Sequence, residues 1–327
     1  MNWTQQINDM ASGYKNSAIL LNSLRVGIFE ALGDDWKSSD EVAEQCSLDL
    51  RATDVVLHAL VASEILLQDG DRFSIVPEAR PVLLGDSPTT LKSILGHNLF
   101  MMRGWSHLDE VLKTGEPIRH EKPNEQQMRD FILGMENVSR ISSLEVATKI
   151  DLSSVGRLLD LGGGPATAAI TFALANPELK CVVFDLEGPV GIGSEQIARA
   201  GLSHRISTVA GDFHTDSIGT GFDVVYLANI IHMMDEEHTL ALLRKSFGAL
   251  VPGGRLLLKD FFLEDSRSEP ASGAQFSVNM LVNTKGGKTY TRTEVMALLN
   301  QAGFADFEVV DVATSSQVII CRADPGE

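Results

Sequence analysis

Apolar residues recur at helical spacing through the first part of the chain. One such stripe runs from residue 14 to residue 32, and its apolar members fall on a single helical face. The members are Ile19, Leu20, Leu24, Ile28, Phe29 and Leu32. A second helix is expected to begin near Ser38, because Glu41 follows three residues later and completes the pattern of a capping box. A third helix is predicted over about 53–63.

A short hairpin follows these helices. Residues 65–75 predict two strands around an Asp-Gly turn, the dipeptide most typical of tight hairpins. Three helices and a hairpin are the outline of a winged helix. Few Lys or Arg and many acids stand in this segment, so dimerisation is favoured over DNA binding. Residues 89–150 predict further helices, with a break at 115–117.

From residue 151 onward, short apolar runs alternate with helical segments. Strands are predicted near 156–161, 180–185, 205–209, 222–227, 254–261, 305–311 and 316–321. This alternation is typical of a parallel sheet covered by helices on both faces. The last two strands have a short connection, which predicts an antiparallel hairpin at one edge. A helix over 236–250 is expected to end at the Pro and Gly residues of 251–254.

The predicted elements divide the chain into three parts. Residues 1–100 form a helical, winged-helix-like dimerisation domain, and residues 101–150 form a helical linker. Residues 151–327 form an α/β domain with a Rossmann-like sheet of seven strands.

The stretch around Asp160 organises the α/β domain. An apolar run ends at this acid, Gly162, Gly163 and Gly164 follow, and a helix begins near Ala166. Glycines permit positive φ and close approach of a ligand to the backbone. The pattern therefore predicts a nucleotide-type site after the first parallel strand. A dinucleotide fingerprint would need glycine where Thr167 stands, so that alternative is disfavoured.

Acids also end the next two predicted strands. Asp185 closes the second strand, where a carboxylate suits a ribose diol. Asp212 and Phe213 follow the third strand and could contact an adenine. Asp160 suits a cationic amino-acid ligand better than a phosphate. Acids after three successive strands, with no basic residue beside them, favour S-adenosylmethionine over NAD.

Composition excludes several classes of partner. The net charge of −17 over 327 residues argues against nucleic acid and against anionic lipid. No apolar run approaches the roughly 18 residues of a membrane span, and no export signal is visible at the N-terminus. The three cysteines are far apart and form no CxxC pair, which predicts reduced thiols in a cytoplasmic protein.

His232 is the candidate catalytic residue. It follows the fourth predicted strand, on the side of the sheet where ligands bind in such folds. Histidine is the side chain best suited to accept a proton near neutral pH. The other His residues and the acids show no metal-ligand spacing, so no metal is expected.

The chain resembles the class I S-adenosylmethionine-dependent O-methyltransferases of the dimeric, two-domain type. This family includes plant caffeate and flavonoid enzymes, acetylserotonin O-methyltransferase, and bacterial carotenoid and polyketide tailoring enzymes. The resemblance covers residues 18–322. Its motifs are Leu159–Gly164, Phe184–Leu186, Ala210–Phe213, Asn229–His232 with Asp235 and Glu236, Pro252–Gly254, and the tail from Gly286 to Phe304.

The resemblance implies a role for each matching residue. Gly162 and its neighbours, Asp160 among them, would hold the methionine end of the cofactor, Asp185 the ribose hydroxyls, and Asp212 with Phe213 the adenine. Leu186 would also belong to the cofactor site. His232 matches the general base, and Asp260 matches the acid that orients it. The positions implied for the acceptor pocket are Phe131, Met135 and Met280.

The chain departs from the family pattern near the base. Met233 and Met234 stand where many members have Asp-Trp, and Arg292 stands where plant enzymes have a second orienting acid. Ala228 replaces a cofactor-contacting lysine, and Ala166 replaces a frequent glycine. These changes keep alternatives open, including C- or N-methylation, non-methyl chemistry of the cofactor, and a non-catalytic cofactor-binding protein.

The function expected from these observations is methyl transfer from S-adenosylmethionine to a hydroxyl group of a small aromatic or polyketide-like molecule. The sulfonium methyl is already activated, so the protein mainly aligns donor and acceptor and excludes water. A phenol has a pKa above 7, so His232 would remove its proton as the methyl transfers. The sequence does not name the acceptor.

Overall fold

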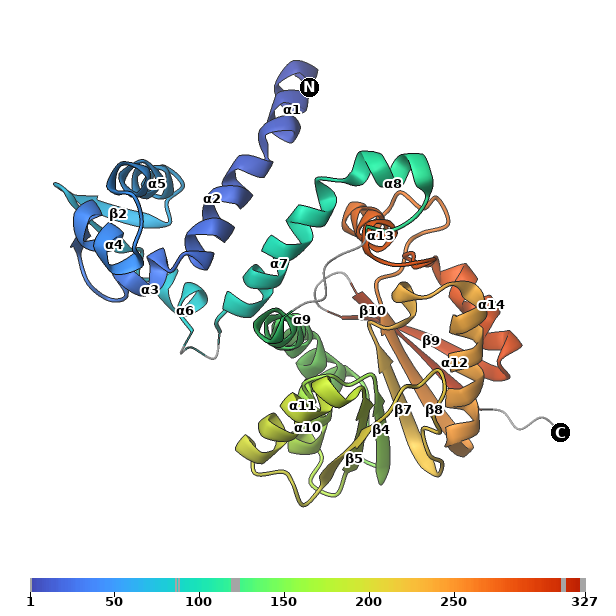
Figure 1. Cartoon of the computed structure of the whole chain (residues 1–327). Coiled ribbons are helices and arrows are strands. Elements are labelled where there is room, and N and C mark those ends of the chain that lie inside the picture. The colour runs from blue at the N-terminus through green and yellow to red at the C-terminus, as the bar shows by residue number, and fades with distance from the viewer. Residues whose placement is uncertain (1, 86, 88, 119–123, 313–315, 324–327) are drawn as a thin grey trace. The chain divides into compact units, whose positions relative to one another are not determined.

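A computed structural model describes residues 2–85, 87, 89–118, 124–312 and 316–323. The chain divides into two compact units, each with its own core (Figure 1). The first consists of Met1–Arg103 and Pro123–Asn137, and the second of Gly104–Lys122 and Val138–Glu327. Helices α7 (Lys92–Trp105) and α9 (Glu125–Lys149) each run from one unit into the other.

The first unit is mainly helical and carries a small sheet. Its helices are α1 (Trp3–Ser12), α2 (Tyr14–Arg25), α3 (Ile28–Leu32), α4 (Ser39–Cys46), α5 (Leu50–Ala62) and α6 (Arg80–Leu83). The predicted hairpin is confirmed as β2 (Leu66–Asp69) and β3 (Arg72–Ile75), and β1 (Lys37–Ser38) pairs with β3. The predicted capping box is also present, because Ser38 and Glu41 exchange hydrogen bonds at the start of α4.

The predicted apolar stripe packs into the core of the first unit. Leu24, Ile28 and Phe29 are buried there against residues of α5 and β3. Helix α1 behaves differently, because none of its residues is buried. Trp3, Ile7 and Met10 expose 65%, 60% and 76% of their surface and lie on one helical face. Helix α1 therefore presents an exposed apolar face.

The second unit is built on a seven-stranded sheet with the order β6-β5-β4-β7-β8-β10-β9. The strands are β4 (Arg157–Leu161), β5 (Lys180–Asp185), β6 (Ile206–Ala210), β7 (Phe222–Ala228), β8 (Leu250–Asp260), β9 (Phe304–Val312) and β10 (Ser316–Ala323). Strands β4 to β8 pair in parallel, and β10 runs antiparallel to both β8 and β9. This is the predicted sheet with its antiparallel hairpin at one edge.

Helices cover both faces of the sheet, and each face has a separate apolar cluster. Helices α10 (Thr167–Ala175) and α11 (Glu187–Arg199) contribute to one cluster. Helices α12 (Glu236–Ala249) and α14 (Arg292–Gln301) contribute to the other (Figure 1). The remaining helices of this unit are α8 (Leu108–Thr114) and α13 (Ala271–Asn283). In the described part of the chain, the structure contains no helix of the length and apolarity that a membrane span requires.

One predicted boundary is wrong. The helix predicted over 236–250 is present as α12 and ends at Ala249, but the strand predicted to begin near 254 already begins at Leu250, so residues 251–254 belong to β8. The pairing of β7 with β8 changes register between Phe222 and Val224. The strand therefore accommodates these Pro and Gly residues at an irregularity of the ladder.

Candidate active site

The glycine turn after β4 needs glycines for steric reasons. Gly162 and Gly164 have φ values of 71° and 50°, in the left-handed region. A Cβ on Gly163 would lie 2.6 Å from Cγ of Asp160. The turn therefore packs directly on the side chain that precedes it and leads into α10.

Asp160 lies beneath this turn. It is 2% exposed, and its Oδ2 accepts a hydrogen bond from the backbone N–H of Ala169 at 3.2 Å. Burial raises the pKa of Asp160 to about 7. In this structure the carboxyl group supports the turn and the first part of α10 from inside. Its predicted contact with the cofactor stays a prediction.

Asp185, at the end of β5, holds the turn from the neighbouring strand. Its Oδ2 accepts from the backbone N–H of Gly164 at 2.8 Å, and its Oδ1 accepts from that of Leu186 at 2.7 Å. Burial raises the pKa of this carboxyl, and the two amide hydrogen bonds oppose the rise. A carboxylate oxygen can accept two hydrogen bonds, so each oxygen keeps one acceptor position. Two free positions match the two hydroxyl groups of a ribose.

The residues predicted for the adenine follow β6. Oδ1 of Asp212 accepts from the backbone N–H of His214 at 2.8 Å, which fixes the loop. Phe213 is partly buried, and its carbonyl oxygen accepts from Nζ of Lys245 at 2.6 Å. Leu186 is the N-cap residue of α11 and is 55% exposed.

Because β6, β5 and β4 are parallel neighbours in the sheet, their carboxyl ends lie side by side at the same end of the sheet. The structure therefore brings the predicted cofactor residues together. Backbone hydrogen bonds connect the three ends, since the N–H of Gly162 donates to the carbonyl of Phe184 and the N–H of Gly211 donates to that of Asp185.

His232 and Asp260 form a buried pair at the next two strand ends. His232 lies in a 3-10 turn, Ile231–Met233, shortly after β7, and Asp260 ends β8. Nδ1 of His232 is 2.7 Å from Oδ1 of Asp260, and the two residues are 7% and 1% exposed. Because a carboxylate only accepts, the ring proton is on Nδ1. Nε2 of the neutral ring is then the free acceptor of a proton.

Two phenylalanines surround the imidazole. The ring of Phe276, on α13, meets that of His232 edge to face, with the centroids 4.8 Å apart. Phe261 follows Asp260 and lies 6.4 Å from the His232 ring. Sequence reasoning missed Phe276. Its spacing from Met280, one helical turn along α13, is the signal that could have found it.

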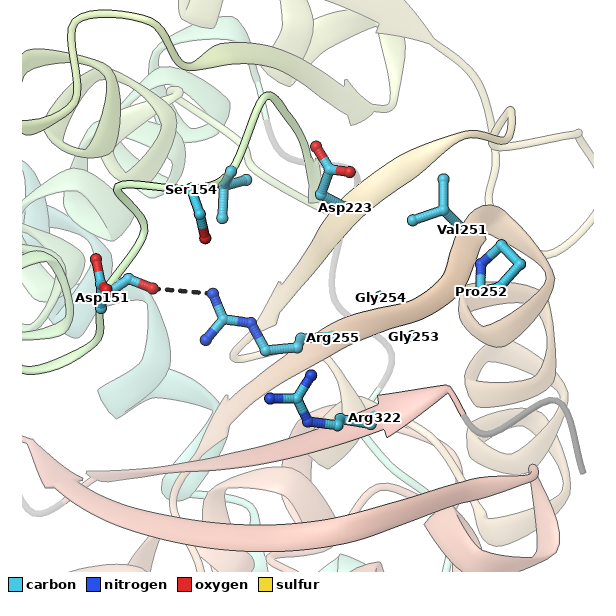
Figure 2. A pocket seen from close by; sticks show the side chains of 10 residues that line it. Asp151, Ser154, Asp223, Val251, Pro252, Gly253, Gly254, Arg255 and Arg322 are labelled. Atoms are coloured by element: carbon cyan, nitrogen blue, oxygen red, sulfur yellow. Dashed lines mark hydrogen bonds between the residues drawn. The ribbon is translucent and has the colours of Figure 1, made fainter.

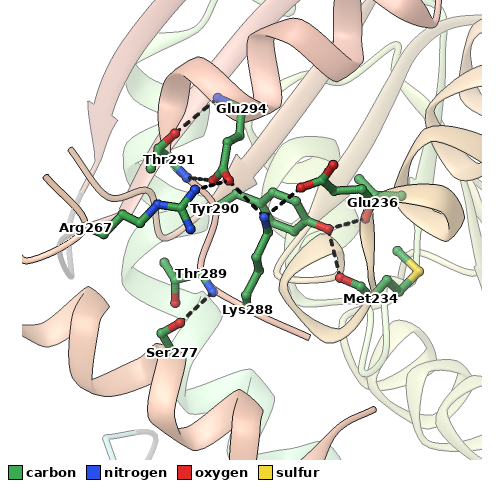
Figure 3. A network of polar contacts seen from close by, with 10 residues as sticks. Met234, Glu236, Arg267, Ser277, Lys288, Thr289, Tyr290, Thr291 and Glu294 are labelled. Carbon is green, nitrogen blue, oxygen red and sulfur yellow. Dashed lines mark hydrogen bonds and ion pairs between the residues drawn. The ribbon is translucent and has the colours of Figure 1, made fainter. Parts of the chain in front are cut away.

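A polar network supports the backbone around His232 (Figure 3). The Tyr290 hydroxyl donates to the carbonyl of Met234 at 2.9 Å, and a Cβ on Gly287 would lie 2.6 Å from the carbonyl oxygen of His232. Nζ of Lys288 bridges carboxylates of Glu236, at 2.8 Å, and Glu294, at 2.9 Å. The segment after α13 is therefore packed tightly against the turn that carries the histidine.

The match to known proteins covers most of the chain. Residues 113–305 match the O-methyltransferase domain. The chain belongs to this family. It is an S-adenosyl-L-methionine-dependent methyltransferase, as the motifs predicted.

Curated relatives align along nearly the whole methyltransferase. The 3-hydroxy-5-methyl-1-naphthoate 3-O-methyltransferase of Streptomyces sahachiroi is 29% identical, with 94% of this chain and 91% of that protein covered. The L-tyrosine C(3)-methyltransferase of Streptomyces lavendulae is 28% identical, with 89% and 82% covered. The structure of human N-acetylserotonin methyltransferase with S-adenosylmethionine superposes with a TM-score of 0.88 at 24% identity. It covers 99% of this chain and 98% of the human one, and this likeness shows the fold.

The structure shows the surroundings of the residues near His232 that differ from the family pattern. Arg292 forms an ion pair with Glu264. Met234 is buried in the core, whereas Met233 is 39% exposed. The described contacts of the His232 ring are those with Asp260 and the two phenylalanines.

The three predicted acceptor residues fall in different units of the methyltransferase. Phe131 and Met135 lie on the part of α9 that belongs to the first unit, and the ring of Phe131 is 5.1 Å from that of His97. Met280 lies on α13 in the second unit and is buried. Their common pocket stays a prediction.

A hollow of about 370 Å³ lies at the other end of the sheet, where the parallel strands begin (Figure 2). It is lined by residues at the amino-terminal ends of the parallel strands, among them Asp223 and Arg255, whose Nη2 donates to the carbonyl of Asp151 at 2.9 Å. This hollow is separate from the strand ends that carry His232. Across the described ranges, no group of three His, Cys, Asp or Glu residues could hold a metal ion.

Proposed function

We propose that this methyltransferase transfers a methyl group to a hydroxyl oxygen of a small aromatic or polyketide-like molecule, with His232 as general base and Asp260 as the residue that orients it. The observation that carries the proposal is the 2.7 Å contact between Nδ1 of His232 and Oδ1 of Asp260. A histidine held by a buried acid presents its other nitrogen in one direction. The relative from Streptomyces sahachiroi, named as a 3-O-methyltransferase of a hydroxynaphthoate, supports an aromatic hydroxyl.

The chain contributes positioning and proton transfer to this reaction. When bound, S-adenosylmethionine supplies a methyl group already activated by its sulfonium sulfur. Asp260 fixes the tautomer of His232, and Nε2 takes the proton of the acceptor hydroxyl. The apolar rings of Phe261 and Phe276 lie beside the His232 imidazole and keep water from it. Asp260 would also stabilise the imidazolium that results.

The cofactor site is proposed at the ends of β4, β5 and β6. Gly162, Gly163 and Gly164 would hold the methionine end, together with Asp160. The free acceptor positions of Asp185 would take the ribose hydroxyls. The residues that would enclose the adenine and the nearby ribose are Leu186, Asp212 and Phe213.

Phe131, Met135 and Met280 are proposed to line the acceptor pocket. Their apolar side chains suit a flat, apolar molecule. The contribution of α13 is supported by Phe276, which touches His232 one turn before Met280.

We also propose a homodimer formed by a winged-helix-like domain at residues 1–100, with a linker at 101–150 and the catalytic domain at 151–327. The exposed apolar face of α1 supports this proposal, because apolar patches of this kind usually meet a partner. Cys46, Cys181 and Cys321 are free thiols, which suits a reducing cytoplasm.

Two other functions remain as rivals. The relative named as an L-tyrosine C(3)-methyltransferase favours carbon as a second candidate acceptor atom. Nitrogen methylation and non-methyl chemistry belong to the same class of rival. A non-catalytic cofactor-binding protein is the other, and the intact pair of His232 and Asp260 argues against it.

A labelled cofactor tests the proposal. The protein would be incubated with S-adenosylmethionine carrying a CD3 group and a panel of phenols, hydroxynaphthalenes and hydroxylated quinones. We expect a product whose label is bonded to oxygen, which NMR distinguishes from a label on carbon or nitrogen. A product labelled only on carbon or nitrogen, or no transfer to any member of the panel, would contradict hydroxyl methylation.

A further inference from the structure

Lys259 is a buried cation whose described partners, the Asn229 amide and the Phe261 ring, are both neutral. It is 1% exposed, and its Nζ donates to Oδ1 of Asn229 at 3.1 Å. Among the described residues, Nζ makes no other hydrogen bond and lies within ion-pair distance of no carboxylate. Burial lowers the pKa of Lys259 to about 8, although Asp260 opposes the change.

An ammonium in this setting is poorly compensated. It has three N–H donors, and a single amide oxygen satisfies one of them. Moving a charge out of water is costly unless an opposite charge accompanies it. The described chain does not provide that charge at hydrogen-bond distance, so an anionic oxygen from a ligand would complete the site.

The position of Lys259 indicates which ligand this is. It precedes Asp260 and pairs in register with Ala228, the last residue of β7. Its Nζ is 5.8 Å from the centroid of Phe261, whose ring is 6.4 Å from that of His232. The glycine turn follows β4, two strands away and therefore about 10 Å across the sheet. The Lys259 ammonium therefore lies beside Phe261, one of the two rings next to the proposed base.

We propose that Lys259 binds a carboxylate carried by the methyl acceptor, so that the acceptor class is a hydroxyaryl carboxylic acid. The inference deepens the proposed function and rests on it, because the acceptor hydroxyl must reach His232. With the carboxylate on Lys259 and the hydroxyl at the histidine, a flat acceptor is fixed at two points. Its orientation, and with it the hydroxyl that is methylated, is then determined.

Asn229 gives the anion a way to reach the ammonium. This residue follows β7 with φ of 58°, a conformation that few residues other than glycine and asparagine adopt. Its backbone N–H donates to the carbonyl of Lys259 at 2.9 Å, which ties the two strand ends together. The Asn229 side chain is only partly buried. A change of rotamer would move the Asn229 amide away from Nζ of Lys259, and a ligand carboxylate could then take its place. The backbone contact between the two residues would stay.

Equilibrium binding to the intact enzyme tests the proposal. The probes are 1-hydroxy-2-naphthoate, 3-hydroxy-2-naphthoate and 6-hydroxy-2-naphthoate, each paired with its carboxamide, which has the same shape and no charge. Calorimetry is done with the protein saturated with S-adenosylhomocysteine, so no turnover occurs. Lys259→Met replaces the ammonium by an apolar side chain of similar length and is expected to fold. Lys180→Met changes an exposed lysine at the start of β5 and is the matched control.

The wild-type protein and Lys180→Met should bind at least one acid about 10-fold more tightly than its amide, the effect of one ionic hydrogen bond. Lys259→Met should lose this preference and keep its affinity for the amide and for S-adenosylhomocysteine. Equal affinity for every acid and its amide in the wild type, or an acid preference that survives in Lys259→Met, would overturn the proposal. A variant that keeps the preference and loses cofactor affinity would assign Lys259 to the carboxylate of the cofactor.

This binding test and the labelling test fail independently. If the acids bind through Lys259 and no methyl ether forms, hydroxyl methylation is wrong and the carboxylate site stands. If methyl ethers form and Lys259→Met does not change the acid preference, hydroxyl methylation stands and the carboxylate site is wrong.

Discussion

The hydroxyl of Tyr290 donates a hydrogen bond to the carbonyl oxygen of Met234, 2.9 Å away and two residues beyond His232. The same hydroxyl is 3.1 Å from Oγ1 of Thr239 in α12. Tyr290 is 1% exposed, so this contact is made inside the protein, where an unpaired carbonyl is costly. It connects the segment after α13 to the turn that places the histidine.

Tyr290→Phe therefore tests whether this support matters to catalysis. Removing one hydroxyl should cost about 1 kcal/mol of unfolding free energy. It should lower kcat by about 10- to 100-fold, because a small displacement of the base misaligns proton transfer, and leave the affinity for S-adenosylmethionine unchanged. Tyr14→Phe, at an exposed tyrosine of α2, is the control. A loss of stability with unchanged kcat would make the contact purely structural.

The ribose assignment is tested at Asp185. Asp185→Ala should weaken binding of S-adenosylmethionine by roughly 1.5–3 kcal/mol, because hydrogen bonds to a charged group are lost. Calorimetry measures the change directly. Asp151→Ala, in the hollow at the other end of the sheet, should leave the affinity as it is. Unchanged affinity in Asp185→Ala would assign the ribose to another group.

Lys259 should give stability an unusual dependence on pH. Its pKa is about 8 in the folded chain and 10.5 in a free lysine. Between these values the unfolded chain binds more protons, so stability should rise with pH. Below pH 8 Lys259 is charged in both states, and burying its ammonium lowers the free energy of unfolding by up to about 3 kcal/mol. Lys259→Met should therefore be more stable at pH 7 and lack the rise between pH 8 and 10.5.

Urea unfolding at pH 7 and pH 10 measures both effects. Lys180→Met, at an exposed lysine, should behave as wild type. If Lys259→Met proved less stable than wild type at pH 7, the ammonium would be stabilising and its burial would need another explanation.

The proposed dimer depends on the exposed face of α1. Ile7→Asp places a charge in the middle of this face, where Ile7 is 60% exposed. Light scattering at micromolar concentration should give a dimer for the wild type and a shift toward monomer for the variant. Leu174→Asp, at an exposed leucine of α10, should remain dimeric. A monomeric wild type would refute the dimer.

Much of the fold could be predicted because it depends on local pattern. The hairpin around Gly70, the capping box at Ser38 and the alternation after residue 151 are all encoded within a few residues. The failure at 251–254 has a physical cause. Pro and Gly usually interrupt strands, but here β8 begins directly after α12 and accommodates them where its pairing with β7 changes register.

The site was predictable where a residue follows a strand and less so where it depends on packing. Placing His232 and Asp260 at neighbouring strand ends required only the order of the strands. The buried state of Asp160 and Lys259 and the contact of Phe276 arise from tertiary packing, which hydrophobic periodicity does not specify. The exposed apolar face of α1 likewise depends on which residues the tertiary packing leaves uncovered.

The central claim is that His232 removes the proton of the acceptor hydroxyl, and the rate of methyl transfer as a function of pH in wild type and His232→Ala tests it most directly. A positioned base contributes a factor of about 10²–10⁴, so the variant should lose this factor at pH 7 and keep its affinity for S-adenosylmethionine. A phenol ionises unaided near pH 10, so the rate of the variant should climb toward that of the wild type as the pH approaches this value. A variant that keeps most of its activity at pH 7, or whose deficit is the same at every pH, would contradict the account.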